Sequence, residues 1–146
     1  LRPKIELAWG HMILEEPSAK NEPIISKNGK LPIMTDALSS KACTPCQGGI
    51  PPLTPAEASH YLAQTQDWKL LQDNTLIARD YSFSDFKAAM DFVIEVAKLA
   101  EYEGHHPDIS FGWGYATVSL QTKKIKGLHE NDFIMAVKID QFFESN

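Results

Sequence analysis

Two adjacent histidines, His105 and His106, are the residues of this 146-residue chain best suited to proton transfer. They follow Gly104, which tolerates the left-handed backbone that ends a helix, and precede Pro107, which disfavours helical geometry at the residue before it. We therefore expect the pair on a fixed turn at a helix exit. Neutral imidazole donates and accepts protons near pH 7, so two rings pointing in opposite directions could serve both ends of one proton-transfer reaction. The alternative for a bare His-His pair is that both are solvent-exposed turn residues.

Two acidic side chains have a spacing that could assist these rings. Glu101 lies four residues before His105, so its carboxylate can point along the helix toward the turn. Asp132 lies in the first turn of the last predicted helix, where it can favour the helix dipole or complete a capping box. For each residue the alternative is a structural or solvated carboxylate with no part in the chemistry.

The only two cysteines, Cys43 and Cys46, form a C-x-x-C motif in a connector rich in Gly and Pro. A thioredoxin-like redox site places this motif after a strand and at a helix N-terminus, and a structural zinc needs two more ligands than the motif supplies. We therefore interpret the motif as local loop structure and expect no bound metal. Two cysteines do not make the disulfide framework of a small secreted domain, so a reducing compartment, the cytoplasm, is expected.

The elements that must position these residues can be predicted from caps and periodicity. Thr54 and Glu57 form a capping box around Pro55 at the first helical position. Asp73-Asn74 is typical of a hairpin turn. The expected elements are a helix from residue 55, strands at 68–71 and 75–83, a long helix from a cap at Ser84 to about Glu103, strands at 109–113 and 116–122, and a helix at about 130–143.

Apolar side chains recur along both later helices, mostly at spacings of three and four in the long one. The expected core positions are Phe86, Ala89, Met90, Val93, Ala97 and Ala100 in the long helix, and Phe133, Met135, Val137, Ile139 and Phe142 in the last one. In the second strand one face mixes Arg79 with apolar residues, so we expect the sheet to have a solvated or ligand-facing side. The order α-β-β-α-β-β-α predicts an α+β two-layer sandwich, with a four-stranded antiparallel sheet covered on one face by three helices.

Residues 1–40 are polar and rich in Pro, Lys, Ser and Asn without sustained periodicity, so we expect a flexible N-terminal extension before a domain at 41–146. The first 50 or so residues are expected to hold little core, so the folded core should begin near Thr54, or near Cys43 if the connector packs against the domain. Gly10-His11-Met12 resembles a cloning scar, and Met34 is a plausible native start.

Composition limits the partners. The net charge is −5 with scattered Lys and Arg, which argues against nucleic acid, and no apolar run approaches the roughly 18 residues of a membrane span. The two edge strands of the expected sheet favour pairing with another copy of the chain, so a homo-oligomer is expected.

The spacing of these residues resembles the signature of the pterin-4a-carbinolamine dehydratase family. Its parts are Glu101, His105-His106-Pro107, the aromatic Trp113, position 123 and Asp132. Bacterial members also commonly carry a C-x-P-C-x-G-G-x-P-P-L stretch, which is similar to Cys43 to Leu53 here, and the resemblance covers about residues 41–143.

The resemblance implies a hydro-lyase that converts a 4a-hydroxytetrahydropterin into the quinonoid dihydropterin, recycling the cofactor of aromatic amino-acid hydroxylases. Such a reaction needs an acid for the departing hydroxyl and a base for the N5 proton, but no metal or organic cofactor. The implied catalytic residues are His105, His106, Lys123, Glu101 and Asp132. The implied pterin contacts are Gly104, His105, His106, Pro107, Trp113, Gln121, Thr122, Lys123 and Lys124. A homotetramer or homodimer is implied as well.

One position departs from the family pattern. Lys123 stands where the family usually has a third histidine or a tryptophan, and a lysine with an ordinary pKa is a poor proton shuttle at neutral pH. It could instead hold a carbonyl or hydroxyl group by a charge-assisted hydrogen bond. If the third histidine of the family is a major acid or base, this protein should catalyse the reaction slowly. If the pair His105 and His106 carries the proton transfers, lysine at position 123 should have little effect on the rate. We favour the second interpretation.

Two other classes of function remain open at this point. Some family members act as non-catalytic dimerisation or assembly cofactors for another protein, and such a member could tolerate the loss of the third histidine. A metal-dependent hydrolase using Glu101 with the two histidines is disfavoured, because adjacent histidines on one turn lack the separated ligands of helical zinc motifs.

Overall fold

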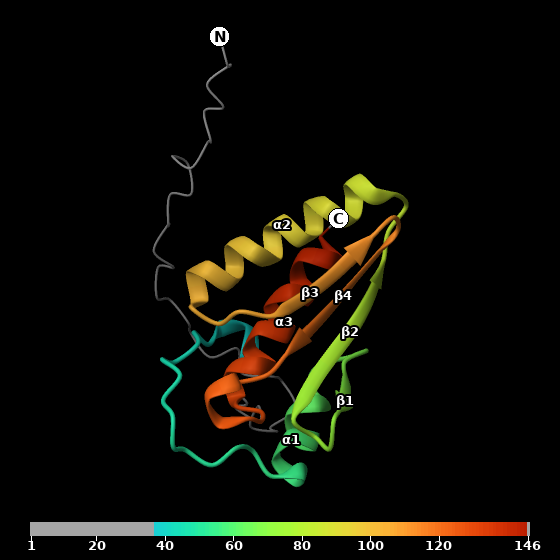
Figure 1. Cartoon of the computed structure of the whole chain (residues 1–146). Coiled ribbons are helices and arrows are strands. Elements are labelled where there is room, and N and C mark those ends of the chain that lie inside the picture. Colours follow the sequence, from blue (N-terminus) through green and yellow to red (C-terminus); the bar gives the residue numbers. More distant parts are fainter. Residues whose placement is uncertain (1–36, 146) are drawn as a thin grey trace, which may run out of the picture. The chain divides into compact units, whose positions relative to one another are not determined.

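The computed structural model describes residues 37–145, which belong to one compact unit, Met34–Asn146. Most of the predicted extension, including Gly10-His11-Met12 and Met34, lies outside the described residues. Figure 1 shows the elements in chain order. They are a 3-10 helix at Leu38–Ser40, α1 at Pro55–Leu62, β1 at Lys69–Leu71, β2 at Leu76–Ser82, α2 at Phe86–Glu103, β3 at Asp108–Gly112, β4 at Tyr115–Leu120, a second 3-10 helix at Lys123–Ile125, and α3 at Glu130–Glu144.

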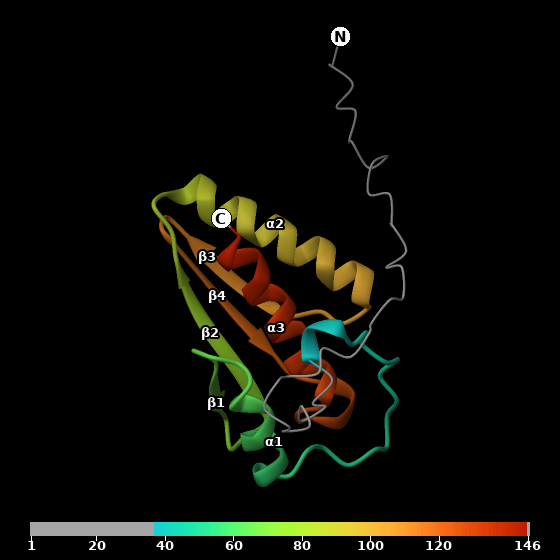
Figure 2. The ribbon, with the colours of Figure 1, turned by 180° about the vertical axis from the view of Figure 1, so that it is seen from behind.

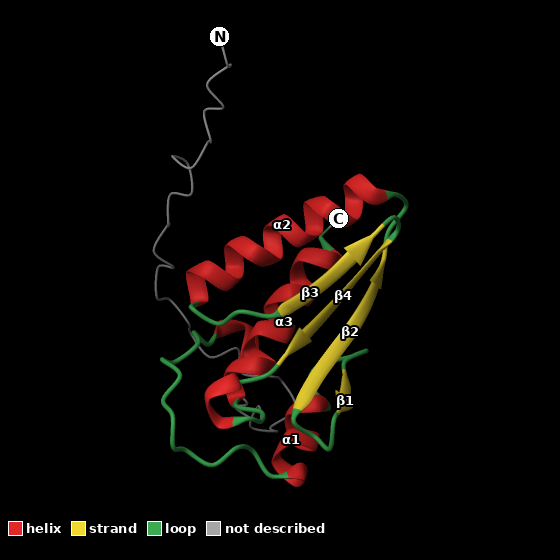
Figure 3. Cartoon of the chain, viewed as in Figure 1, coloured by secondary structure: helices red, strands yellow, loops and turns green. Residues whose placement is uncertain are grey.

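The four strands form one antiparallel sheet in the order β1-β2-β4-β3, and the predicted fold class and element order are confirmed. The central pair β2 and β4 runs in register from Ile77 opposite Leu120 to Ser82 opposite Tyr115. Helices α2 and α3 lie side by side along one face of this sheet, as Figures 2 and 3 show from its two sides. The edges of the sheet are β1 and β3.

The helix-facing side of the sheet holds the core. Ile77 and Tyr81 of β2 are buried there, together with Ala116, Val118 and Leu120 of β4. Arg79 lies between the two β2 residues and is the polar member that makes the face mixed. Its guanidinium pairs with Asp140 of α3 at 2.8 Å, and the Tyr81 hydroxyl donates to the same carboxylate at 2.6 Å. The mixed pattern therefore reflects an ion pair between sheet and helix.

Helix α2 differs from the prediction in its cap and its buried stripe. Its N-cap is Asp85, not Ser84, because the Asp85 carboxylate accepts a hydrogen bond from the Ala88 amide at 2.8 Å. The buried residues are Ala89, Phe92, Val96 and Ala100. Of the predicted core positions, Phe86 is 46% exposed and Ala97 is also exposed. Apolar residues occupy more than one side of α2, so spacings of three and four fit two stripes and did not identify the buried one.

Two helix ends lie where the sequence predicts them and bring distant segments together. Helix α2 ends at Gly104, which has a left-handed backbone with φ of 65°, and its N–H bonds back to the Ala100 carbonyl. Helix α3 begins with a capping box in which the Asp132 carboxylate accepts from the N-cap amide of His129 at 2.9 Å. These two ends carry the candidate site.

The segment before α1 packs more tightly than predicted. Leu38 is only 4% exposed and belongs to the core, and the 3-10 helix that contains it lies against α3. The expectation that residues up to about 50 hold little core is therefore wrong for residues 38–46. They are held by polar contacts to α2 and α3 that no periodicity reveals. No helix between residues 37 and 145 is long and apolar enough to cross a membrane.

A candidate active site at the exit of α2

His105 and Asp132 form a buried pair at the centre of the site. The His105 Nε2 and Asp132 Oδ1 atoms are 2.6 Å apart, and the two side chains are 5% and 0% exposed. The backbone of His105 is fixed by a hydrogen bond from its amide to the Ala100 carbonyl. A buried imidazole and carboxylate at this distance are joined by a short hydrogen bond, which holds each side chain in one orientation.

The Asp132 carboxylate is held from three directions. Besides the His105 ring, its Oδ2 atom accepts hydrogen bonds from the Thr122 hydroxyl at 2.8 Å and from the His129 amide at 2.9 Å. Thr122 follows β4 and His129 caps α3, so this carboxylate joins the sheet, the exit of α2 and the start of α3. Because its oxygens accept from three donors, the buried carboxylate is well compensated.

His106 and Glu101 form a second pair that faces solvent. The His106 Nε2 and Glu101 Oε1 atoms are 2.7 Å apart, and the side chains are 60% and 80% exposed. No hydrogen bond to the other ring nitrogen, Nδ1, occurs within residues 37–145. The two rings therefore lie in different surroundings: His105 is buried beside Asp132, and His106 is exposed beside Glu101. A substrate could reach the His106 ring without displacing the contacts that hold His105.

Two lysines from the second 3-10 helix border the turn. Lys123 Nζ lies 3.1 Å from Oδ1 of Asp108, which follows His106 by two residues in the sequence. Both side chains are 67% exposed. Lys124 Nζ donates to the carbonyl oxygen of Cys46 at 3.1 Å. The structure thus brings position 123 to the mouth of the histidine turn, as the spacing implies, and an exposed ammonium is available there.

Two of the predicted pterin contacts lie away from this centre. Trp113 is 72% exposed in the turn between β3 and β4, at the far end of a five-residue strand from the histidines, a length of about 17 Å. The Gln121 amide donates to the Thr75 carbonyl at 3.1 Å, toward the β1–β2 turn. Within one chain, neither side chain is brought together with His105 and His106, whereas Gly104 and Pro107 flank the pair on the turn itself.

Three residues that the sequence analysis did not single out for this role complete the buried side of the site. Cys46 Sγ lies 3.5 Å from His105 Nδ1. Asn131, next to Asp132, is 1% exposed and fixes the cysteine loop through Thr44, whose amide donates to Asn131 Oδ1 at 3.0 Å. The C-x-x-C motif was the only sequence signal that pointed to this loop, and nothing in the pattern placed it beside His105.

Glu103 is the third of these residues and anchors the same loop to α2. Its side chain is 3% exposed, pairs with Lys138 of α3 and accepts the Cys43 amide at 2.9 Å. Burial would raise the pKa of this carboxyl, but the hydrogen bonds from Lys138 and Cys43 outweigh it and hold the pKa below its ordinary value. Glu103 therefore serves as a buried anion that joins the loop, α2 and α3.

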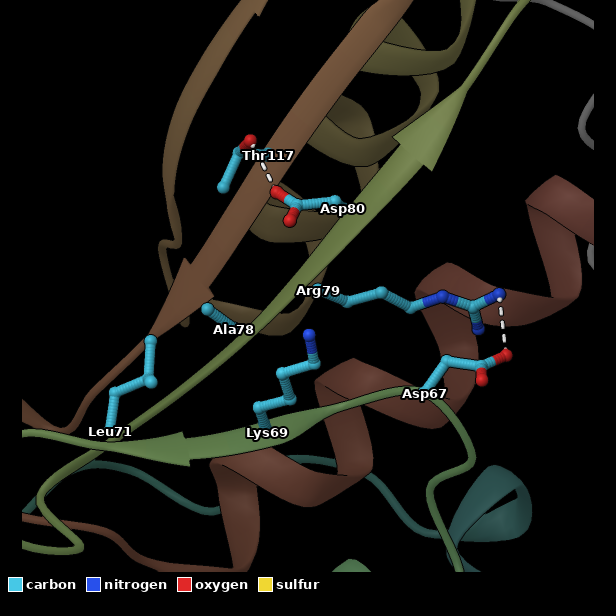
Figure 4. A pocket seen from close by; sticks show the side chains of 7 residues that line it. All are labelled: Asp67, Lys69, Leu71, Ala78, Arg79, Asp80 and Thr117. Carbon is cyan, nitrogen blue, oxygen red and sulfur yellow. Dashed lines mark hydrogen bonds and ion pairs between the residues drawn. The ribbon is translucent and has the colours of Figure 1, made fainter.

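A cavity of about 500 Å³ lies elsewhere, beside β1 and the uncovered side of the sheet (Figure 4). It is lined by Asp67, Lys69, Leu71, Ala78, Arg79, Asp80 and Thr117, and none of these is a predicted site residue. Two internal contacts, Arg79 with Asp67 at 3.3 Å and Thr117 with Asp80 at 2.7 Å, already engage four of its five polar side chains. Across residues 37–145, no group of three or more His, Cys, Asp and Glu side chains is arranged to hold a metal ion.

Comparison with known proteins places this arrangement in a family. Residues 51–142 match the family model described as pterin 4 alpha carbinolamine dehydratase. A protein of Azoarcus sp. (strain BH72), named as a candidate pterin-4-alpha-carbinolamine dehydratase, is 61% identical over 108 residues, which are 74% of this chain and 92% of that protein. A relative from Aromatoleum aromaticum with the same name is 60% identical over 107 residues, covering 73% of this chain and 96% of the relative.

A solved structure agrees with the sequence comparison. The transcriptional coactivator/pterin dehydratase of Brucella melitensis has 30% sequence identity and a TM-score of 0.59, over 62% of this chain and 96% of that protein. The matched region in the family model begins before α1 and ends near the end of α3, so it contains both histidine–carboxylate pairs. By fold, by matched length and by sequence identity, this chain belongs to the pterin 4 alpha carbinolamine dehydratase family.

Proposed function

We propose that this protein removes water from a 4a-hydroxytetrahydropterin to give the quinonoid dihydropterin, in the recycling of the pterin used by aromatic amino-acid hydroxylases. The observation that carries the proposal is the pair of adjacent imidazoles, each hydrogen-bonded to a different carboxylate, one buried and one open to solvent. Family membership supports the pterin as substrate.

The reaction requires two proton transfers. An acid protonates the departing 4a-hydroxyl so that it leaves as water, and a base accepts the proton from N5. His106 is the better placed of the two histidines for direct transfer, because its ring is exposed and its Nδ1 is not engaged by the described residues. Glu101 lies 2.7 Å from the opposite nitrogen, Nε2, and so orients the ring with Nδ1 facing away from this carboxylate.

His105 is the second acid/base residue of the proposal and also fixes the geometry. Its two ring nitrogens lie next to Asp132 and Cys46, so its orientation is set by the fold. Because it adjoins His106 on a turn with fixed caps, its position determines where the exposed ring can point. Gly104, Pro107 and Thr122 contribute to pterin binding in this proposal by shaping the same turn.

Lys123 is assigned to binding and not to proton transfer. Its ammonium pairs with Asp108 in the open part of the site, where it can donate to a carbonyl or hydroxyl group of the pterin. Lys124 lies next to it but bonds the cysteine loop.

The decisive test is stopped-flow dehydration of a freshly generated 4a-hydroxytetrahydropterin, with and without the protein. We expect the decay of the hydroxypterin to accelerate in proportion to protein concentration. The matched control is His106→Ala at the same concentration, which should return the decay close to the spontaneous rate. If the parent protein does not accelerate dehydration, the enzymatic proposal is wrong.

A non-catalytic role as a dimerisation or assembly cofactor for another protein is the second candidate. It is favoured by Lys123 at the family's third-histidine position and by the name of the Brucella melitensis protein, which includes transcriptional coactivator. This role requires a folded surface but no proton transfer. A parent protein that is folded yet inactive in the stopped-flow test would support it.

We also propose a homo-oligomer, a tetramer or at least a dimer. The support is the open edges β1 and β3 together with large apolar side chains that are exposed on α2, among them Ile94 at 43%. Light scattering should give a multiple of the 16.3 kDa chain mass over a wide concentration range. A mass equal to one chain throughout that range would reject the oligomer.

A further inference from the structure

The two cysteines of the loop at residues 43–46 lie in opposite surroundings, although only two residues separate them. Cys43 Sγ lies 3.8 Å from the Asn131 carbonyl oxygen, to which it can only donate. Cys46 Sγ lies 3.8 Å from the Asn131 Nδ2 group, which donates to it, and 3.5 Å from His105 Nδ1. One sulfur therefore faces an acceptor, while the other faces a donor and a base.

The loop that carries them is held rigidly at the start of α3. The Asn131 side chain accepts from the Thr44 amide at 3.0 Å and donates to the Thr44 carbonyl at 2.7 Å. The Cys46 carbonyl accepts from the Lys124 ammonium at 3.1 Å. Cys46 is thus positioned through both its sulfur and its carbonyl oxygen, and it remains partly exposed.

Cys46, His105 and Asp132 have the connectivity of an activated nucleophile. The thiol lies within reach of one ring nitrogen, and the other nitrogen is 2.6 Å from a buried carboxylate that fixes the tautomer. With Nε2–H donated to Asp132, Nδ1 is left as the acceptor for the Cys46 thiol proton. A thiol next to a base and an amide donor yields the reactive thiolate more readily than one in an apolar setting.

Cys43 lacks this activation. Burial, with the Glu103 carboxylate close by, raises the pKa of its thiol to about 12. It therefore remains protonated at neutral pH and is a poor first nucleophile. It is the candidate for the second sulfur, because it lies three positions before Cys46 in the same loop and both sulfurs contact Asn131.

We propose that Cys46 is a thiol activated by His105 and Asp132, that it is oxidised by hydroperoxides such as hydrogen peroxide, and that Cys43 resolves the product to a disulfide. In the first step the Cys46 proton passes to His105 Nδ1 and the sulfur attacks one peroxide oxygen. The O–O bond breaks, and the departing hydroxide takes the proton from His105 and leaves as water. Cys46 becomes a sulfenic acid, oxidised by two electrons, and the peroxide is reduced.

In the second step the Cys43 sulfur attacks the sulfenic sulfur. An S–S bond forms, the S–O bond breaks, and the hydroxide leaves with the Cys43 proton as a second water. The Cys46 thiol can then no longer donate to His105. Oxidation of the loop therefore changes the hydrogen bonding of His105, a histidine of the candidate active site.

Alkylation of the full chain by iodoacetamide tests the activation without any dehydratase assay. We expect peptide mass spectrometry to show Cys46 alkylated at least roughly tenfold faster than Cys43 at neutral pH. His105→Gln should slow the alkylation of Cys46 by about the same factor. The matched control is His106→Gln, which alters the neighbouring ring that has no contact with Cys46 and should leave both rates unchanged. Equal rates for the two cysteines in the parent protein would overturn the proposal even if His105→Gln fails to fold.

Treatment with hydrogen peroxide tests the two steps. The parent protein should lose the mass of two hydrogens as the disulfide forms. In Cys43→Ser, oxidation should stop at a sulfenic acid on residue 46 that dimedone traps, and Cys46→Ser should show neither product. Trapping of dimedone on Cys43 in the Cys46→Ser variant, at the rate seen for Cys46, would contradict the assigned order of the two sulfurs.

Discussion

The two histidine–carboxylate pairs are neighbours on one turn, yet they are built in different ways. His105 and Asp132 are 27 residues apart in the sequence, are buried, and link three parts of the fold. His106 and Glu101 are five residues apart, and both are exposed. In the function we propose, these two constructions serve two tasks: the ring that is fixed by the fold orients the ring that is free to meet a substrate.

The last turn of α2 repeats the contrast. Glu101 points to solvent beside His106, whereas Glu103, two residues later, is buried against the cysteine loop and Lys138. Removing a group from the exposed side should change activity with little effect on folding. Removing one from the buried side should change folding first.

The largest effect is expected for His106→Ala. If the exposed ring carries proton transfer, its loss should lower the dehydration rate by ~10²- to 10⁴-fold. The unfolding midpoint in urea should stay close to that of the parent, because the side chain is 60% exposed. Stopped-flow kinetics and urea titration of the same preparation would check both. A mild rate effect here, combined with complete loss of turnover in Lys123→Ala, would contradict the assignment.

Asp132→Ala should disrupt the buried pair, His105 and Asp132, and so destabilise the fold. It leaves His105 and Thr122 without their shared acceptor and removes the capping box of α3, so we expect the free energy of unfolding to fall by about 3 to 5 kcal/mol. Urea unfolding followed by circular dichroism measures this loss. Glu101→Ala is the matched control, and an equal loss of stability in that variant would refute the division into a buried and an exposed pair.

Lys123→Ala should have a smaller effect that appears in binding. Removal of a charge-assisted hydrogen bond worth about 1.5 to 3 kcal/mol should raise KM by roughly ten- to a hundredfold and leave kcat nearly unchanged. Lys123→His restores the usual family residue and should keep or raise kcat. A loss confined to kcat would show that the ammonium acts in the chemical step.

The smallest effect concerns stability in acid. The pKa of Glu103 is lower in the folded chain than its ordinary value of 4.5, so the unfolded chain takes up the proton first. The stability that this carboxylate contributes is therefore complete above about pH 4.5 and is lost as the pH falls through the folded pKa. Urea midpoints of the parent and Glu103→Gln should converge as the pH falls below that value.

The sequence predicted those parts of the site that depend on local signals. Gly104 and Pro107 predicted the helix exit, and Asp132 predicted the capping box, because a cap is decided within a few residues. The pairing of strands followed from turn residues and alternation. The buried stripe of α2 was not predictable. Phe86 and Phe92 both belong to series of apolar residues spaced by three and four, and only the packing against α3 and the sheet decides which series is buried.

The parts that could not be predicted depend on contacts between distant segments. Nothing in the C-x-x-C motif indicates that Cys46 lies next to His105, which is 59 residues later. Likewise nothing in the sequence distinguishes Glu103 as a site residue, and only the approach of Lys138 and the Cys43 amide makes it a buried anion. Such contacts follow from the tertiary arrangement and leave no periodic trace.

The first turn of α3 has a further consequence for local opening of the protein. The residues 43–46 form neither helix nor strand, but the Thr44 amide is bonded to Asn131, and the Asp132 amide to His129 within the same turn. Because one opening of that turn releases both amides, they should exchange with deuterium at one common rate as a single cooperative unit. An irregular loop would then show the protection of a helix, and a ligand that closes the turn would slow exchange at a site almost ninety residues earlier in the chain.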